Sequence, residues 1–355
     1  MEKQYALVCV PVTRSDEVGF LFGAEPENPF EMPEQFRVIE VRDDAAHATE
    51  AMGTKPKFWY HDDDRGLCLF KEPRGNTGED WAEKVSAELA DLLGLPHAEY
   101  ELALWQGRRG TISPTFVPEG GQWIPGNQLL QVFVPNYPAP GPGSRKFYRV
   151  SQHTVDAVFE VLELRHRGSP PVVQLPIGFA GMEGVSISAE VFTGYLMLDA
   201  WIGNTDRHHE NWGWVLKPVE PSLSNASAMH LAPTFDHASS LGAHEPDSNR
   251  EERLSTRDVG RSVERYVEKA RSALYAKEGN KKALATVDAF LAAARLCPAA
   301  ARSWLRRLSR VRLEEMRTIV ERVPGKRISS IGIEFACKVL ELNQSRLLVL
   351  EETLP

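Results

Sequence analysis

The feature that most constrains this chain is a polar stretch enclosed between two apolar segments. Residues 203–211 have the sequence Gly-Asn-Thr-Asp-Arg-His-His-Glu-Asn, and Trp-Gly-Trp-Val follows at residues 212–215. The apolar spacing over residues 190–202 predicts a helix that ends where the polar stretch begins. Backbone groups in such a loop need hydrogen-bond partners or water, so the loop has to line a cavity. We therefore expect a functional loop at residues 203–211.

Two side chains of this loop, Asp206 and Asn211, have a spacing that points to phosphate chemistry. Protein kinases use Asp-x4-Asn in the catalytic loop, where the Asp accepts the substrate hydroxyl's hydrogen and the Asn holds Mg²⁺. This spacing is common by chance, but Asp236 supplies a second carboxylate after a short apolar entry. Mg²⁺ prefers oxygen ligands and keeps several waters, so Asn211 and Asp236 with nucleotide phosphates form an adequate ligand set.

A lysine at the end of an apolar strand is the candidate for contact with phosphates. Lys71 directly follows the apolar residues 67–70, and a lysine in such a strand is costly unless it is paired. Glu83, in the helix predicted after this strand, is the expected partner, and kinases use this lysine–glutamate arrangement. The alternative is that Lys71 is an outward-facing residue of an edge strand.

A glycine-bearing basic loop precedes Lys71 by one hairpin. It contains Gly53, Thr54, Lys55 and Lys57, and it matches neither the Walker pattern nor G-x-G-x-x-G. Its position suits a loop that folds over phosphates with its backbone N–H groups. Residues 75–78 are a second candidate, although a connector into the next helix explains them better.

The order of predicted elements divides the chain into two unlike lobes. The strand-rich part has strands at residues 5–12, 36–41, 99–104 and 129–134, a hairpin at residues 58–70, and a helix at residues 80–93. Four prolines in residues 135–146 exclude regular structure there. The later helices are predicted at residues 155–165, 190–202, 263–276, 282–294, 299–323 and 333–350. We predict an α+β fold with a strand-rich N-lobe (1–135), a Pro-rich linker (136–149) and a mostly helical C-lobe (150–355). A cleft between the lobes is the expected ligand site.

Charge and composition exclude several classes of function. The chain has 41 Lys and Arg against 49 Asp and Glu, so a broadly basic surface for direct nucleic-acid binding is not expected. The first 50 residues hold 11 acidic and 4 basic residues, which indicates a solvated face or an interaction surface. No apolar run approaches the about 20 residues of a membrane helix, so no membrane association is expected. Four scattered cysteines without CxxC spacing fit a reducing cytoplasm.

Taken together, these motifs resemble the HipA-like serine/threonine kinases, whose core is distantly similar to phosphatidylinositol 3/4-kinases. The resemblance rests on residues 203–211, 235–241, 70–72 and the helix ending Leu-Leu-Gly-Leu-Pro at residue 96, which occur in the family's order. It implies a bilobal protein-kinase-like fold and Mg-ATP-dependent transfer of the γ-phosphate to a protein Ser or Thr. The implied roles are Asp206 as catalytic base, Asn211 and Asp236 as Mg²⁺ ligands, and Gly53, Thr54, Lys55, Lys57, Lys71, Glu83, Gln131, Phe133 and His208 around ATP.

The chain departs from this family in three respects. Only an acidic segment of some 50 residues precedes the predicted phosphate loop, where the family's toxins carry a substantial subdomain. Those toxins usually pair with a helix-turn-helix antitoxin, but this sequence shows no sign of how such a partner would dock, so an antitoxin-like partner is a weaker expectation. Thr54 stands where the family can carry an autophosphorylated serine. Two alternatives stay open: a nucleotide-binding pseudokinase that acts as an interaction module, and a small-molecule phosphotransferase. The five histidines in residues 208–244 lack HExxH spacing, which makes a zinc enzyme a weaker alternative.

Overall fold

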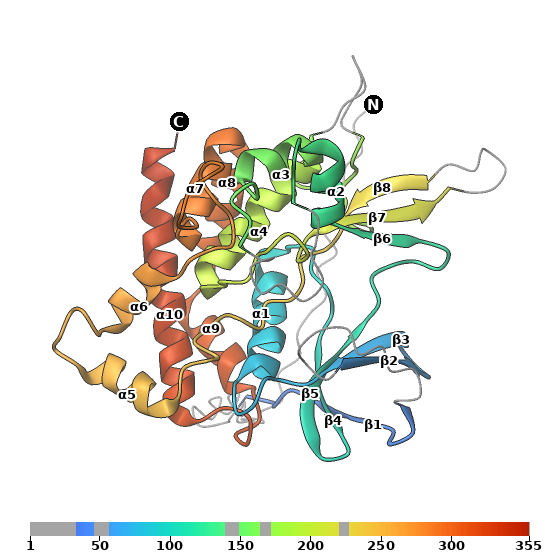
Figure 1. Cartoon of the computed structure of the whole chain (residues 1–355). Coiled ribbons are helices and arrows are strands. Elements are labelled where there is room, and N and C mark those ends of the chain that lie inside the picture. Colours follow the sequence, from blue (N-terminus) through green and yellow to red (C-terminus); the bar gives the residue numbers. More distant parts are fainter. Residues whose placement is uncertain (1–32, 46–56, 139–148, 164–171, 220–226, 355) are drawn as a thin grey trace, which may run out of the picture. The chain divides into compact units, whose positions relative to one another are not determined.

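The computed structural model describes residues 33–45, 57–138, 149–163, 172–219 and 227–354. The chain from Glu34 onward forms one compact unit, in which two β-sheets and a group of helices confirm the predicted α+β class. Figure 1 shows the larger sheet at one end of this unit, helix α1 beside it, and most of the remaining helices beyond α1. The predicted strand at residues 5–12 lies outside the described residues.

The larger sheet has five strands in the order β1-β4-β5-β3-β2. Its members are β1 (Val38–Val41), β2 (Lys57–Asp62), β3 (Gly66–Lys71), β4 (Glu101–Trp105) and β5 (Arg108–Pro114). β1 and β4 are parallel, and the other neighbours are antiparallel. The predicted hairpin is therefore β2–β3, and its tip is the turn at residues 63–65, which Gly66 follows as the first residue of β3.

Alternation of buried and exposed side chains explains why β2 and β3 form a sheet. Phe58 and Phe70 face each other across the hairpin, with ring centroids 5.1 Å apart, and Trp105 of β4 lies 4.6 Å from Phe58. These rings and the other buried residues on this face form a separate small apolar core. Such packing fixes the register, because a slip of one residue would turn the aromatic side chains to solvent. The register in turn places Lys71 at the end of β3.

Helix α1 (Glu79–Leu93) connects the five-stranded sheet to the helical part of the unit. Its apolar residues recur every three to four positions and all except Leu92 are buried, and Gly94 ends the helix in the left-handed conformation with φ of 61°. Glu79 and Asp80 in the first turn suit the positive end of the helix dipole. Glu83 lies one turn further on and is also buried.

A second sheet joins segments that lie far apart in the sequence. Its strands are β6 (Gln122–Pro125), β7 (Gly213–Pro218) and β8 (Ser227–Leu231), in that order and antiparallel. Gly213 has to be glycine, because a Cβ atom there would lie 2.2 Å from the carbonyl oxygen of Ile124. The close β6–β7 pairing anchors the chain immediately after the polar loop.

The helices after β6 build the core of the unit. They are α2 (Gly126–Phe133), α3 (Val155–Leu162), α4 (Ser188–Ile202), α5 (Asp247–Ser255), α6 (Val263–Lys269), α7 (Thr286–Leu296), α8 (Pro298–Leu308), α9 (Leu313–Glu321) and α10 (Ser330–Leu348), followed by a 3₁₀ turn at Val349–Thr353. α4 is buried on nearly all sides and contacts α7, α8 and α10. A helix that is apolar all round belongs in the centre of a core, as α4 does here.

Three predictions of secondary structure are wrong in whole or in part, and one of them is the helix expected at residues 263–276, which ends at Lys269. The strand expected at residues 129–134 is helix α2, because Leu129, Leu130 and Phe133 have helical spacing and the first two are buried together. The single helix expected at residues 299–323 is two helices, α8 and α9. The side-chain amide of Gln344 donates to the carbonyls of Leu308 and Val311 at the break, which satisfies backbone groups that a continuous helix would use.

Two further observations concern the described residues alone. None of their helices combines the length and the apolar character that crossing a bilayer requires. Nor do they bring together three or more His, Cys, Asp or Glu side chains in an arrangement that could hold a metal ion. The predicted linker falls largely on residues 139–148, outside the described residues, so the lobe boundary stays a prediction.

Candidate active site

The polar loop between α4 and β7 is held in place by a buried arginine. Arg207 is 0% exposed, and its guanidinium donates from Nε and Nη2 to the two carboxylate oxygens of Asp199 at 2.7 and 2.8 Å. Nη1 donates to the carbonyl of Asn211 at 2.7 Å, and Nη2 to Oγ1 of Thr234 at 2.7 Å. Burial lowers the pKa of Arg207, but the Asp199 carboxylate outweighs this effect and the net pKa is raised. One side chain thus ties α4, the loop and the segment after β8 together.

Asp206 and Asn211 face each other across this loop. The side-chain amide nitrogen of Asn211 donates to the carbonyl of Asp206 at 2.7 Å, and the Asp206 N–H donates to Oδ1 of Asn204 at 3.1 Å. Because the nitrogen of the Asn211 amide is engaged, its Oδ1 oxygen is the atom that suits a metal ion. The Asp206 side chain is 38% exposed, so its carboxylate is open to a reactant.

Asp236 adopts a backbone conformation that is uncommon for a residue other than glycine. Its φ is 60°, in the left-handed region, where such residues are rare and are maintained by their surroundings. Two hydrogen bonds hold it: its N–H donates to the hydroxyl of Tyr100 at 3.2 Å, and the next N–H, of His237, donates to Oε1 of Glu83 at 2.6 Å. The turn therefore has a defined orientation, set by α1 and by the residue before β4.

Lys71 of the five-stranded sheet meets Asp236 across 165 residues of sequence. Its Nζ donates to Oδ1 of Asp236 at 2.7 Å. Glu83, the expected partner, accepts the His237 N–H instead and is not within ion-pair distance of Lys71. Burial lowers the pKa of Lys71, but the charges of Asp236 and Glu83 outweigh burial, so the net pKa is raised and the ammonium form persists. Both carboxylates therefore act on Lys71, but Asp236 is the one in contact.

His208 lies close to this group as an uncharged imidazole. Burial lowers its pKa to about 4, the Asp236 charge opposes that shift, and Arg207 and Lys71 add to it. Nε2 of His208 is 3.9 Å from Oδ1 of Asp206, and Nδ1 accepts the Glu210 N–H at 3.2 Å. At neutral pH the imidazole is therefore a hydrogen-bonding group and adds no charge to the site.

The other residues predicted around ATP lie in three places. Gly53, Thr54 and Lys55 fall outside the described residues. Lys57 begins β2 directly opposite Lys71, so both side chains leave the same face of the sheet. Gln131 and Phe133 lie on α2.

These two α2 side chains contact the segment after α2 and strand β7, and neither contact is with Lys71, Asp206, Asn211 or Asp236. The Gln131 amide donates to the Pro138 carbonyl at 3.4 Å, and the Phe133 ring is 5.9 Å from the Trp214 ring. The first residues of α2 approach the polar loop instead, since the Asn127 amide donates to Glu210 at 3.3 Å.

Sequence reasoning missed two groups that shape the site. The pair of Arg207 and Asp199 could have been predicted from the sequence, because a carboxylate within an apolar helix and an arginine in the following loop both need a partner if they are buried. No sequence pattern pointed to Tyr100. Burial raises its pKa well above the ordinary value, and the Glu83 and Asp236 charges add to this, so its hydroxyl stays protonated and can donate to Glu83.

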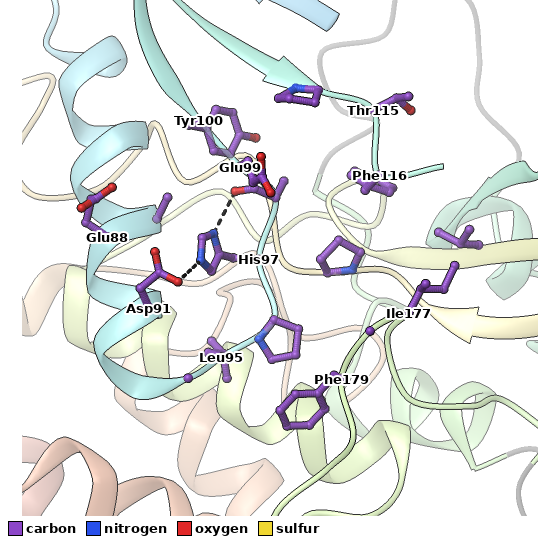
Figure 2. A pocket seen from close by; sticks show the side chains of 18 of the residues that line it. Glu88, Asp91, Leu95, His97, Glu99, Tyr100, Thr115, Phe116, Ile177 and Phe179 are labelled. Atoms are coloured by element: carbon purple, nitrogen blue, oxygen red, sulfur yellow. Dashed lines mark hydrogen bonds and ion pairs between the residues drawn. The ribbon is translucent and has the colours of Figure 1, made fainter. Parts of the chain in front are cut away.

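A cavity of about 690 Å³ has Tyr100 among its lining residues (Figure 2). It is bounded by the end of α1, the segment leading to β4, and residues 177–179. His97 stands in its wall, with Nε2 3.0 Å from Asp91 and Nδ1 2.9 Å from the Ala98 carbonyl. Tyr100, which accepts the Asp236 N–H, is shared with the cluster described above, whereas Lys71 and Asp206 do not line this space.

Comparisons with known proteins identify the fold. Scans against family models and against curated proteins give no match. The chain is similar to the Helicobacter pylori proinflammatory kinase CtkA, with a TM-score of 0.62 and 20% identity over 84% of this chain and 93% of that one. It also matches a chain of the Shewanella oneidensis MR-1 toxin–antitoxin complex of HipA, HipB and operator DNA, with a TM-score of 0.49 and 12% identity, over 84% of this chain and 64% of that one. The similarity to CtkA confirms the predicted kinase fold.

Proposed function

We propose that this protein is a HipA-like kinase that uses ATP and Mg²⁺ to phosphorylate a Ser or Thr hydroxyl of a protein. The observation that carries the proposal is the meeting of Lys71 with Asp236, at 2.7 Å, next to the loop that holds Asp206 and Asn211. A cation from a sheet, two oxygen ligands and an open carboxylate are the parts that phosphoryl transfer requires.

The available donors fit the implied metal ion. The Asp236 carboxylate and the Asn211 amide oxygen are hard oxygen ligands, and Mg²⁺ usually takes one or two such ligands with waters and phosphate oxygens. Bound Mg-ATP would supply the phosphoryl group and the cation that offsets its charge. Tyr100 and Glu83 hold Asp236 in its left-handed turn, so the ligand oxygen is oriented in advance.

The chain's own residues then have separate tasks. Lys71 binds phosphate oxygens, with Lys57 on the same face of the sheet. Asp206 accepts the proton of the substrate hydroxyl while the hydroxyl oxygen bonds to the γ-phosphorus. The bond from that phosphorus to the β–γ bridging oxygen breaks, and ADP leaves with the electron pair. Arg207 holds the loop in position through its hydrogen bonds to Asp199, the Asn211 carbonyl and Thr234. A cytoplasmic location, which rests on the scattered cysteines, and an antitoxin-like partner, which rests on the sequence resemblance, belong to the same proposal.

The test is transfer of labelled γ-phosphate to proteins of a cell extract, with the wild type and two aspartate variants. We expect Asp206→Asn to reduce label by about 10³-fold, because the base is lost while the fold is kept. Asp156→Asn, at an exposed aspartate of α3, is the matched control and should label like the wild type. Equal labelling by the Asp206 variant, or ATP binding without any transfer, would refute the kinase and favour the pseudokinase.

A further inference from the structure

A second, smaller cavity opens beside the start of the catalytic loop. Its volume is about 220 Å³, and it is lined by residues of α5 and α6 together with Gly203, Thr205, Ser239, Ser240, Ala243 and His244. These helices pack against α10, at the edge of the unit (Figure 1). The cavity therefore lies on the helical side of the site, where Asp206 follows Thr205 directly.

The lining of this cavity contains basic side chains but no acidic ones. Arg253 and Lys269 are cations, His244 is an imidazole, and the lining includes no carboxylate. Two carboxylates outside the lining contact two of these groups: Glu245 is 3.0 Å from Arg253, and Glu79 is 2.8 Å from His244. Lys269, in the last turn of α6, has no ion pair with another described residue and is exposed. At least one positive charge thus faces the cavity without a partner.

The contrast with the larger cavity shows that this basic lining is specific to its position. The 690 Å³ cavity includes Glu88, Asp91, Glu99 and Glu101 among its lining residues, and the whole chain has a formal charge of −8. A cavity without carboxylates, next to the catalytic loop of an acidic protein, has the electrostatics of an anion site.

Fixed groups give the cavity hydrogen-bond donors as well as charge. The Arg253 guanidinium lies over the Tyr266 ring at 5.1 Å, which with Glu245 restricts its orientation. Thr205 and Ser239 are hydroxyl-bearing residues of the lining, and the Thr205 N–H donates to the Ser239 carbonyl at 3.2 Å. Hydroxyl, guanidinium and ammonium groups together are the donors that bind the oxygens of a phosphate or carboxylate.

We infer that this cavity binds an oxyanion side chain of the protein substrate, a phosphoserine or a glutamate close to the acceptor hydroxyl. The inference rests on the proposed function and narrows its substrate class to segments with an acidic residue near the target Ser or Thr. Thr205 lines the cavity and the next residue is the proposed base, so an anion held there positions the neighbouring hydroxyl at Asp206. Arg253 and Lys269 are the specificity-determining residues.

Peptide binding measured without ATP tests the inference independently of catalysis. Fluorescent degenerate peptides with a central serine would carry phosphoserine, glutamate or alanine at each flanking position, and the full chain would be titrated by anisotropy. We expect about fivefold to tenfold tighter binding of the phosphoserine or glutamate pool than of the alanine pool at low salt. A preference for phosphoserine alone would identify a phosphoryl site, and equal binding of all pools would overturn the inference.

Charge-altering variants assign the preference to this cavity. Lys269→Glu and Arg253→Gln should each remove most of the preference, whereas Lys281→Glu, at an exposed lysine outside the cavity, should leave it intact. A preference that persists in both cavity variants would overturn the assignment. Because binding needs no phosphate transfer, anion-selective binding without kinase activity would refute the proposed function alone, and transfer without any acidic preference would refute this inference alone.

Discussion

The buried pair of Arg207 and Asp199 gives the sharpest quantitative prediction. In Arg207→Met, four hydrogen bonds of 2.7–2.8 Å disappear, and the Asp199 carboxylate, 2% exposed, keeps only the amide of Asn204 at 2.8 Å. Breaking a buried ion pair from one side costs about 3–5 kcal/mol, because the remaining charge is left without a counterion. Against a typical total of about 5–15 kcal/mol, the variant stays folded but loses a large part of its stability.

The double variant Asp199→Asn with Arg207→Met separates charge from position. With both charges removed, we expect the double variant to lose less free energy of unfolding than the two single variants added together, by about 2–3 kcal/mol. Phosphate transfer should not recover, since nothing then holds the Asn211 carbonyl and Thr234 in place.

Urea unfolding of the four proteins at pH 7 and low salt measures the coupling, with transfer assays run in parallel. A loss of unfolding free energy below about 1 kcal/mol in Arg207→Met, or strict additivity in the double variant, would refute the argument that removing Arg207 leaves a costly unpaired charge on Asp199. Recovery of transfer in the double variant would show instead that Arg207 does not position the loop.

Three further outcomes follow from the same geometry. Tyr100→Phe removes the acceptor of the Asp236 N–H, so transfer should fall about tenfold with the fold retained; unchanged Mg²⁺ dependence and rate would contradict this. Gly213→Ala should lower the free energy of unfolding by about 1–3 kcal/mol, since the new Cβ would clash with the Ile124 carbonyl oxygen. An unchanged urea midpoint would show that β6 and β7 can move apart at little energetic cost. Burial lowers the pKa of His208 and His209 to about 4 from 6.5, so both are neutral in the folded state above that pH. Stability is therefore complete above pH 6.5 and is lost as pH falls towards 4, by roughly 3 kcal/mol per imidazole, and urea unfolding of His209→Gln should show a shallower pH dependence than the wild type.

Local patterns in the sequence were sufficient for the parts of the site that lie close together along the chain. Asp206 and Asn211 are five positions apart, and the apolar helix before them and Trp212 after them fix where the loop begins and ends. The β2–β3 hairpin was also predictable. Apolar residues alternate along both strands, so Phe58, Tyr60, Cys68 and Phe70 can all be buried on the same face of the sheet. Such features depend on periodicity and turn chemistry, which are properties of neighbouring residues.

Contacts between distant segments could not be obtained in this way. Lys71 pairs with Asp236 and not with Glu83, because Tyr100 and Glu83 together hold the Asp236 turn in a left-handed conformation that no local pattern encodes. The strand expected at residues 129–134 became α2 for a similar reason, since a short apolar run fits either structure until its packing partners are known. Side-chain identity limits which groups can meet, but which of several carboxylates reaches a given lysine depends on the close packing of α1, β4 and the segment after β8.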